Sequence, residues 1–142
     1  VLLFHAHDPG LDETDIWITP GGALEPGEDF EYTLRRELWE EIGWESGDIG
    51  PWVWSRRHVW SKDNNTYESA ERFYLLRVIN NKVEPQLVTP MERRNIVEHR
   101  WWSVAEIQAA TGHEVFVPRR LGDLLVPIVA GDIPEVPIDT GI

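Results

Sequence analysis

The stretch Gly22–Trp44, GALEPGEDFEYTLRRELWEEIGW, carries the clearest structural signal in this chain. From Asp29 onward it contains no glycine or proline until Gly43. Within that interval the apolar side chains recur every four residues, at Leu34, Leu38 and Ile42. This spacing predicts an amphipathic helix whose apolar stripe packs against a core. Asp29 is a suitable N-cap and Gly43 a suitable C-cap, so the sequence specifies both ends of the helix.

The same helix carries three carboxylates close together. At 100° per residue, the side chains of Glu37, Glu40 and Glu41 share one face. Each like-charge pair costs a few tenths of a kcal/mol, and the helix dipole disfavours anions near the C-terminus. Hard oxygen ligands on one face suit Mg²⁺ or Mn²⁺, and such a cation would offset the repulsion. Taken alone, the three glutamates also fit a solvated acidic face.

The composition is that of an acidic chain of single-domain size. It has 142 residues, of which 42% are hydrophobic and 27% charged, so one globular domain is expected and disorder is not. Thirteen Lys and Arg against 25 Asp and Glu give a net charge of −12. Nucleic-acid polymers and anionic membranes attract basic surfaces, and both are therefore excluded as partners. A phosphate ligand would need a cation to bring it to this chain.

Two absences narrow the class further. The chain has no cysteine, which excludes disulfide scaffolds, cysteine zinc sites and thiol nucleophiles and fits a reducing, cytoplasmic location. Its longest apolar stretches, Val1–Phe4 and Leu124–Ala130, are far shorter than the ~20 residues that span a bilayer. No signal peptide is visible, but the chain begins inside an apolar run and without Met.

Strands and helices alternate along the rest of the chain. Strands are expected at Val1–Ala6, Ile16–Thr19, Pro51–Trp60, Glu68–Asn80 (centred on Phe73–Val78) and Val97–Trp102. A short helix is expected after Ser103, which can form a capping box with Glu106. A last helix is expected over Pro118–Ala130, with Pro127 as a kink or stop, followed by an extended tail over 131–142. The mixture predicts an α/β or α+β sandwich.

The spacing within Gly22–Trp44 resembles the Nudix box, G-x5-E-x7-R-E-U-x-E-E-x-G-U, where U is a bulky apolar residue. Every fixed position is filled, from Gly22 through Glu28 and Arg36-Glu37 to Gly43. Trp44 stands at the last U, where the family usually has an aliphatic residue, and this changes a packing contact only. The resemblance implies a Nudix-type α/β/α sandwich with a mixed central β-sheet, formed by residues 1–142 as one domain.

The resemblance also implies an activity. Nudix enzymes hydrolyse a phosphoanhydride (pyrophosphate) bond in a nucleoside diphosphate linked to another moiety, such as a modified nucleotide, nucleotide sugar or (d)NTP. It implies that Glu37, Glu40 and Glu41 hold Mg²⁺ (or Mn²⁺) for catalysis. Arg36 resembles the family arginine that orients a box glutamate. Gly22 fits the need for a backbone that turns sharply beside the helix and the metals.

Two features of the resemblance leave alternatives open. Some Nudix-like domains are non-catalytic nucleotide sensors, but they usually lose box glutamates, and this chain keeps all of them. Dimers are common in the family, which favours a homodimer. After the box, Val59–Lys62 contains neither the Pro typical of ADP-ribose pyrophosphatases nor the Tyr typical of dinucleoside polyphosphate hydrolases. The nucleotide derivative that serves as substrate therefore stays open.

The general base and the substrate-binding residues are less sharply indicated. In this family the base comes from the box or from a downstream loop, and the downstream candidates are Glu68, Glu71, Glu92 and Glu98. We favour Glu92, because it lies in a loop ahead of Trp101–Trp102. For a nucleobase, Trp17 is the preferred stacking partner, with Trp54 or Tyr74 as alternatives. Arg56 is the preferred phosphate-binding residue. Core packing is nevertheless the simpler explanation for each aromatic residue, and a solvated surface position is the simpler one for Arg56.

Overall fold

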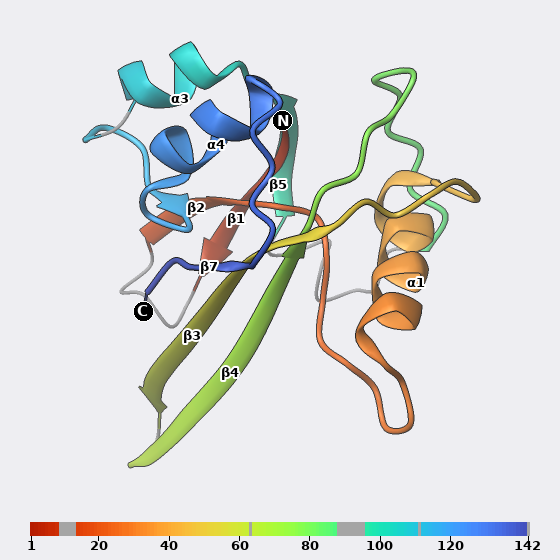
Figure 1. Cartoon of the computed structure of the whole chain (residues 1–142). Helices are drawn as coiled ribbons and strands as arrows, with labels where there is room; N and C mark the ends of the chain where they lie inside the picture. Colours follow the sequence, from red (N-terminus) through yellow and green to blue (C-terminus); the bar gives the residue numbers. More distant parts are fainter. Residues whose placement is uncertain (9–13, 63, 88–95, 111, 142) are drawn as a thin grey trace.

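The computed structural model describes residues 1–8, 14–62, 64–87, 96–110 and 112–141. Its strands form two sheets (Figure 1). The first has the order β5–β1–β2–β6, with bounds Ile96–Trp101, Leu2–Asp8, Thr14–Ile18 and Phe116–Val117. The second has the order β4–β3–β7, with bounds Asn65–Tyr74, Trp52–Lys62 and Ile138–Asp139. The helices are α1 (Phe30–Ile42), α3 (Val104–Ala110) and α4 (Leu121–Val129).

Both sheets are mixed. β1 pairs antiparallel with β2 and β5, whereas β2 pairs parallel with β6. In the second sheet, β3 pairs antiparallel with β4 and parallel with β7. In Figure 1, α3 and α4 lie at the upper left, next to β1, β2 and β5, and α1 lies on the right. The predicted mixed α/β sandwich is therefore confirmed, with its strands divided between two sheets rather than joined in one.

The core lies where β1, β2 and β3 meet the two C-terminal helices. Leu3, Ile107 and Leu121 are completely buried. Trp102 packs edge-on against both Trp17 and Phe116, with ring centroids 4.9 and 5.3 Å apart. Large aromatic rings bury much apolar area each and prefer such edge-on contacts. The abundance of tryptophan in the sequence is thus partly explained by packing.

Helix α1 begins and ends where its sequence predicts. The Asp29 carboxylate accepts a hydrogen bond from the Tyr32 N–H at 2.9 Å, and this closes the N-terminus. Gly43 has φ 75°, in the left-handed region, and its N–H donates to Trp39 O at 3.0 Å. A Cβ at Gly43 would lie 2.5 Å from Glu84 O, so glycine is required there by space as well as by φ.

The apolar stripe of α1 faces the rest of the domain across a cavity. Leu38 is buried, and Leu34 and Ile42 are half-buried. These three side chains line one wall of a cavity of ≈ 200 Å³, whose other walls include residues of β3, β4 and α4. The stripe therefore faces the rest of the domain as predicted, but it lines a cavity there and is not part of the packed core cluster.

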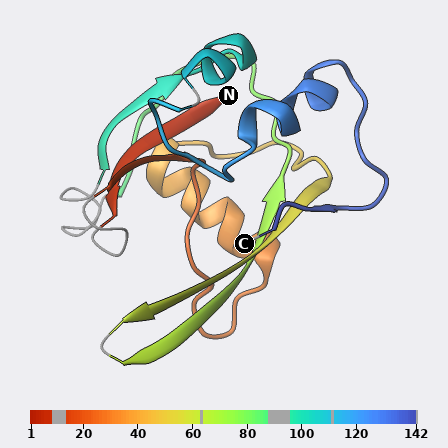
Figure 2. The ribbon, with the colours of Figure 1, turned by 90° about the vertical axis from the view of Figure 1, so that its left-hand side faces the viewer.

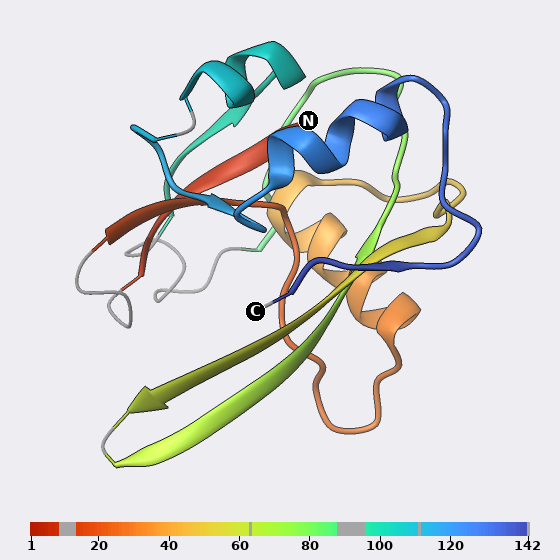
Figure 3. The same ribbon diagram turned by 60° about the vertical axis from the view of Figure 1, so that its left-hand side comes forward.

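Strand β4 differs from its predicted extent. It ends at Tyr74, so the expected centre at Phe73–Val78 is wrong, and residues 75–87 contain no strand. The register explains the difference, because Tyr74 pairs with Trp52 at the start of β3. Two further backbone hydrogen bonds follow this pair, from the Leu75 N–H to Pro51 O at 3.0 Å and from the Gly50 N–H to Leu75 O at 2.9 Å, so residues 76–78 lie beyond the paired segment. Figures 2 and 3 show the β3–β4 hairpin extending well beyond the other elements.

The C-terminal region contains both confirmed and corrected predictions. The capping box is confirmed, because the Ser103 N–H donates to Glu106 Oε2 at 2.8 Å and the Glu106 N–H donates to Ser103 Oγ at 3.2 Å. Helix α4 starts at Leu121, three residues after Pro118, and it includes Pro127 rather than stopping there. The tail pairs with β3 through β7, and the Thr140 N–H donates to Ser55 O at 2.8 Å. None of the described helices is both long and apolar enough for a membrane crossing.

Truncating Ile107 tests this core. We expect Ile107→Ala to lower the free energy of unfolding by about 2–5 kcal/mol, because the side chain is fully buried and its loss leaves a cavity. Urea unfolding followed by circular dichroism measures the change. Val129→Ala is the matched control, since Val129 is 67% exposed and should cost far less. Equal losses in the two variants would contradict the assigned core.

Candidate active site

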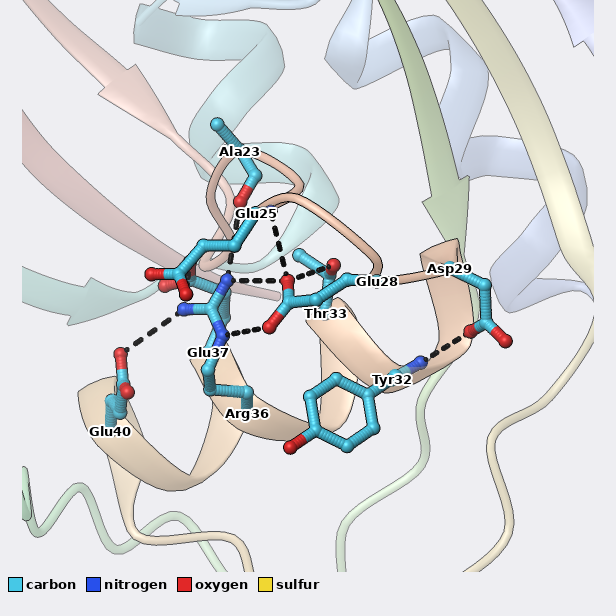
Figure 4. Close-up of polar contacts among 9 residues, drawn as sticks. All are labelled: Ala23, Glu25, Glu28, Asp29, Tyr32, Thr33, Arg36, Glu37 and Glu40. Carbon is cyan, nitrogen blue, oxygen red and sulfur yellow. Dashed lines mark hydrogen bonds and ion pairs between the residues drawn. The ribbon is translucent and has the colours of Figure 1, made fainter.

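Arg36 is the centre of a polar network that joins α1 to the loop before it (Figure 4). Its guanidinium donates two hydrogen bonds to Glu28, from Nε to Oε1 at 2.8 Å and from Nη2 to Oε2 at 2.9 Å. Nη1 donates to Glu37 Oε1 at 2.7 Å and to Glu40 Oε2 at 3.4 Å. Nη2 also donates to Ala23 O at 3.2 Å. One planar cation therefore holds three carboxylates and a loop carbonyl in a fixed arrangement.

Glu28 anchors this network on the loop side. Besides Arg36, it accepts hydrogen bonds from Thr33 Oγ1 at 2.6 Å and from the Glu25 N–H at 3.1 Å. The hydrogen bonds from Arg36 and Thr33 lower the pKa of Glu28 to about 2. In turn, the hydrogen bond to Glu28 raises the pKa of Arg36 above its ordinary value. Glu28 is thus a structural carboxylate that stays ionised and holds Arg36.

The two glycines before the helix have different physical roles. Gly21 takes the unusual backbone conformation, with φ 141°, and its N–H donates to Glu41 Oε2 at 2.8 Å. Gly22 lacks a positive φ but has no room for a side chain, because a Cβ would lie 2.2 Å from Glu37 Oε1. The sharp turn expected of Gly22 therefore belongs to Gly21. Gly22 instead lets the backbone approach the Glu37 carboxylate closely.

The box glutamates are not a solvated surface. Glu37 is only 6% exposed, and Glu40 and Glu41 are half-buried. Three carboxylates, those of Glu28, Glu37 and Glu40, contact the guanidinium of Arg36, and that of Glu41 contacts the Gly21 N–H beside them. Several carboxylate oxygens are thus gathered on α1 and the loop before it. The donor set is the kind that a hard divalent cation prefers.

The side-chain arrangement is not that of a closed metal site. Within the described residues, no three acidic or histidine side chains are grouped closely enough to hold a metal ion. Arg36 contacts Glu37 and Glu40, while Glu41 is drawn to the Gly21 N–H. The donor chemistry therefore fits a divalent cation, and Glu37, Glu40 and Glu41 are the residues that could hold one.

A cavity of ≈ 450 Å³ lies beside this cluster. Its walls come from the loop at Gly21–Leu24, from Phe30 and Thr33 of α1, and from the hairpin residues Arg56 and Ser69–Tyr74. Arg56 donates to both oxygens of Glu71, at 3.2 and 3.0 Å, and Ser69 Oγ donates to Glu71 Oε1 at 3.2 Å. Two residues predicted to bind substrate, Gly22 and Arg56, thus line one cavity.

Comparisons with known proteins identify the family of this chain. The family model for the NUDIX domain matches residues 1–120, which include every residue of the cluster. The chain belongs to the NUDIX family. A comparison with curated proteins gives no significant match.

Two solved structures resemble this Nudix domain at low sequence identity. One is a Caenorhabditis elegans Ap4A hydrolase in a binary complex, at 18% identity and a TM-score of 0.48, covering 92% of this chain and 84% of that one. The other is a NUDIX hydrolase from Nitrosomonas europaea, at 22% identity and a TM-score of 0.47, covering 93% and 81%. Family membership supports a nucleotide pyrophosphate hydrolase as the general activity.

Other predicted residues lie apart from the cluster. Trp17 is 4% exposed, its ring stacks on His5 at 4.6 Å, and its Nε1 donates to Glu114. No face of this indole is open to a nucleobase, so the stacking role does not fit this position. The alternative Trp54 is also buried, whereas Tyr74 lines the cavity.

The general-base candidates are scattered. Glu92 lies outside the described residues. Glu98 is on β5, with Oε1 3.7 Å from His5 Nδ1, and the exposed Glu68 pairs with Arg57. Of the downstream candidates within the described residues, only Glu71 lines the cavity.

The sequence did not single out Thr33 or Arg72 for this Nudix site. Thr33 is buried beside Glu28, and Arg72 lines the cavity from β4. Thr33 lies in the first turn of α1, with its N–H bonded to Asp29 O, and this position brings its hydroxyl to Glu28. Arg72 depends on how the hairpin packs near α1, and no local pattern specifies that.

Gly22→Ala tests the close approach to Glu37. The added methyl group would displace the carboxylate from its contact with Arg36, so we expect divalent-cation affinity to fall about tenfold to a hundredfold. Calorimetric titration with Mn²⁺ measures it. Gly27→Ala is the control, because Gly27 has φ 92° but no atom near its Cβ position. That variant should lose stability without losing cation affinity, and an equal loss of affinity in both would refute the role of Gly22.

The low pKa of Glu28 predicts an acid dependence of stability. Its folded pKa of about 2 lies below the ordinary 4.5, so its contribution is present above about pH 4.5 and is lost as the pH falls toward 2. We expect the unfolding free energy of Glu28→Gln to fall less steeply over this range than that of the wild type. Urea unfolding at a series of pH values measures the slopes.

Glu28 is not the only carboxylate whose low pKa contributes to this slope. Glu106 also has a pKa of about 2, because Ser103 and Arg100 donate hydrogen bonds to it, so some slope remains in every variant. Glu45→Gln removes an exposed carboxylate outside the network and should keep the wild-type slope. Identical slopes for Glu28→Gln and the wild type would contradict the assigned coupling between Glu28 and Arg36.

Proposed function

We propose that this Nudix domain is a metal-dependent hydrolase that cleaves the pyrophosphate bond of a nucleoside diphosphate derivative. Modified nucleotides, nucleotide sugars and (d)NTPs are the substrate candidates. The observation that carries the proposal is the cluster of buried and half-buried glutamates around Arg36, placed beside a cavity of ≈ 450 Å³. Ligand-binding cavities of roughly 300–1,000 Å³ are typical for small molecules of this size.

The residues proposed to hold Mg²⁺ (or Mn²⁺) are Glu37, Glu40 and Glu41. The gathering of carboxylate oxygens on one side of α1 supports this, because carboxylates are the ligands that a hard divalent cation prefers. When bound, such a cation neutralises phosphate oxygens and lowers the pKa of a coordinated water. The positive charge of the bound cation also explains how a chain of net charge −12 attracts an anionic substrate.

Arg36 and Gly22 act on the reaction through Glu37. Arg36 holds the Glu37 carboxylate through a charge-assisted hydrogen bond, and Gly22 leaves space for it. Because Glu28 anchors Arg36 from the loop, the position of Glu37 is fixed from two sides. Phosphoryl transfer depends mainly on such positioning and on charge stabilisation.

Arg56 is the proposed substrate-binding residue of the hairpin. It lines the cavity and is half-buried, and its guanidinium is oriented by Glu71. Glu92 remains our proposed general base, with Glu71 as the alternative because it borders the cavity. The dependence of kcat on pH, measured for Glu92→Gln and Glu71→Gln, distinguishes the two. In the wild type kcat rises with pH as the base loses its proton, and removal of the base abolishes this rise.

The assembly and location of the protein are also proposals. Dimers are frequent in the family, which supports a homodimer, and light scattering measures it. The absence of cysteine supports a location in the cytoplasm, where the environment is reducing.

The alternative function is a nucleotide-binding sensor without turnover. Retention of every glutamate of the box argues for catalysis instead. Calorimetry with a nucleotide panel separates the two, because binding without any product would favour the sensor.

Glu41→Gln tests the proposed activity. Product release is measured with Mg²⁺ over dNTPs, an oxidised dGTP, ADP-ribose, nucleotide sugars and dinucleoside polyphosphates. We expect the wild type to hydrolyse at least one class and Glu41→Gln to lose at least about a hundredfold in kcat, because a charged oxygen ligand is removed. Glu45→Gln makes the same chemical change at an exposed position outside α1 and should retain activity. Full metal-dependent turnover by Glu41→Gln would overturn the metal assignment.

A further inference from the structure

The guanidinium of Arg72 contacts two aromatic rings. Its Cζ lies 4.0 Å from the ring centroid of Phe30, the first residue of α1. It also lies 4.1 Å from the ring centroid of Trp52, the first residue of β3. The Trp52 indole is itself fixed, because its Nε1 donates to Trp54 O at 2.8 Å. The two cation–π contacts orient the guanidinium and leave its N–H groups available for hydrogen bonds.

Arg72 has no acidic partner in the part of the chain that the structure describes. There, no carboxylate forms an ion pair or hydrogen bond with it. The other arginine of the same cavity, Arg56, is bound to Glu71. In a chain with 25 acidic residues, a guanidinium that is held in place yet left without a carboxylate is well suited to bind an anion.

The position of Arg72 connects it to the proposed reaction. It lines the cavity of ≈ 450 Å³ together with Gly22, which touches the Glu37 carboxylate. Arg72 is exposed and lines this cavity, so its guanidinium is accessible to a ligand there. A substrate that places its diphosphate at the box glutamates and extends into the cavity would meet Arg72 with its remaining part.

We propose that Arg72 is a specificity-determining residue that binds a further oxyanion of the substrate, beyond the diphosphate that is cleaved. This inference rests on the proposed function. The oxyanion is a terminal phosphate or a carboxylate, because both accept two parallel hydrogen bonds from the edge of a guanidinium. The site therefore favours substrates whose distal part is charged over those whose distal part is neutral.

The geometry also predicts that lysine cannot replace Arg72. A lysine ammonium keeps the charge but lacks the planar face that stacks on Phe30 and Trp52 and the edge that binds two oxygens. The aromatic rings would then no longer orient the cation. A lysine substitution therefore separates the effect of the positive charge from the effect of an oriented guanidinium.

Matched substrate pairs test the proposal. UDP-glucuronate and UDP-glucose differ by a carboxylate, and ATP and ADP differ by a phosphate. For wild type, Arg72→Met and Arg72→Lys, kcat/KM is measured for both members of each pair, and inhibition by inorganic tripolyphosphate is compared with inhibition by pyrophosphate. Arg57→Met is the matched control, because Arg57 lies on the same hairpin but pairs with Glu68 and does not line the cavity.

The expected result is a change in the ratio between the members of a pair. Arg72→Met should reduce the preference for the more highly charged member about tenfold or more, mainly through KM, and should weaken tripolyphosphate inhibition to a similar extent. Arg72→Lys should recover only part of the preference, and Arg57→Met should keep it. The pair that responds identifies the oxyanion as carboxylate or phosphate.

Other outcomes overturn the inference in distinguishable ways. If Arg72→Met lowers kcat/KM equally for both members, the residue serves only to fix α1 to β3, and the anion-binding role is refuted. If Arg72→Met leaves the ratio of kcat/KM and the inhibition by tripolyphosphate unchanged, the anion-binding role is likewise refuted. In that case, wild-type turnover that depends on Glu41 leaves the proposed function intact. Absence of turnover for every nucleotide would instead count against the proposed function, and tripolyphosphate binding to wild type and Arg72→Met, measured by calorimetry, still decides the role of Arg72.

Discussion

The ion pair between Arg36 and Glu28 is the interaction on which the arrangement of the site depends. It joins a residue of α1 to a residue of the preceding loop through two parallel hydrogen bonds, at 2.8 and 2.9 Å. Both side chains are largely shielded from water, with exposed fractions of 19% and 10%. Removing either partner would leave the other charge shielded and unpaired, which is much more costly than losing an exposed ion pair. The loop, the helix and Glu37 are therefore held as one unit.

Local sequence rules predicted the parts of the fold that depend on near neighbours. Asp29 and Gly43 cap α1, and Ser103 and Glu106 form a capping box, because each of these contacts spans only a few residues. The common face of the box glutamates follows in the same way from helical geometry. The family was identified from this same short stretch, and the match over residues 1–120 agrees with it.

The parts that sequence rules missed depend on contacts between distant segments. The end of β4 is set by its pairing with Trp52, and the burial of Trp17 is set by His5 and Trp102. No periodicity within β4 or β2 contains that information. Similarly, Glu28 lies directly before the N-cap Asp29 and Arg36 lies within α1, and helical periodicity does not specify how the chain before the cap turns to bring the two charges together.

The two walls of the cavity belong to separate segments of the chain. One wall comes from the glycine loop and α1, which carry the Arg36 network, and the other comes from the β3–β4 hairpin. Within the described residues, the hydrogen bonds of Arg56 and Glu71 stay on the hairpin, and Arg72 contacts α1 through the Phe30 ring. Hairpin residues other than Arg72 can therefore be substituted during divergence without disturbing the carboxylates on α1. In evolutionary terms, the recognition surface can drift while the acidic helix face is kept.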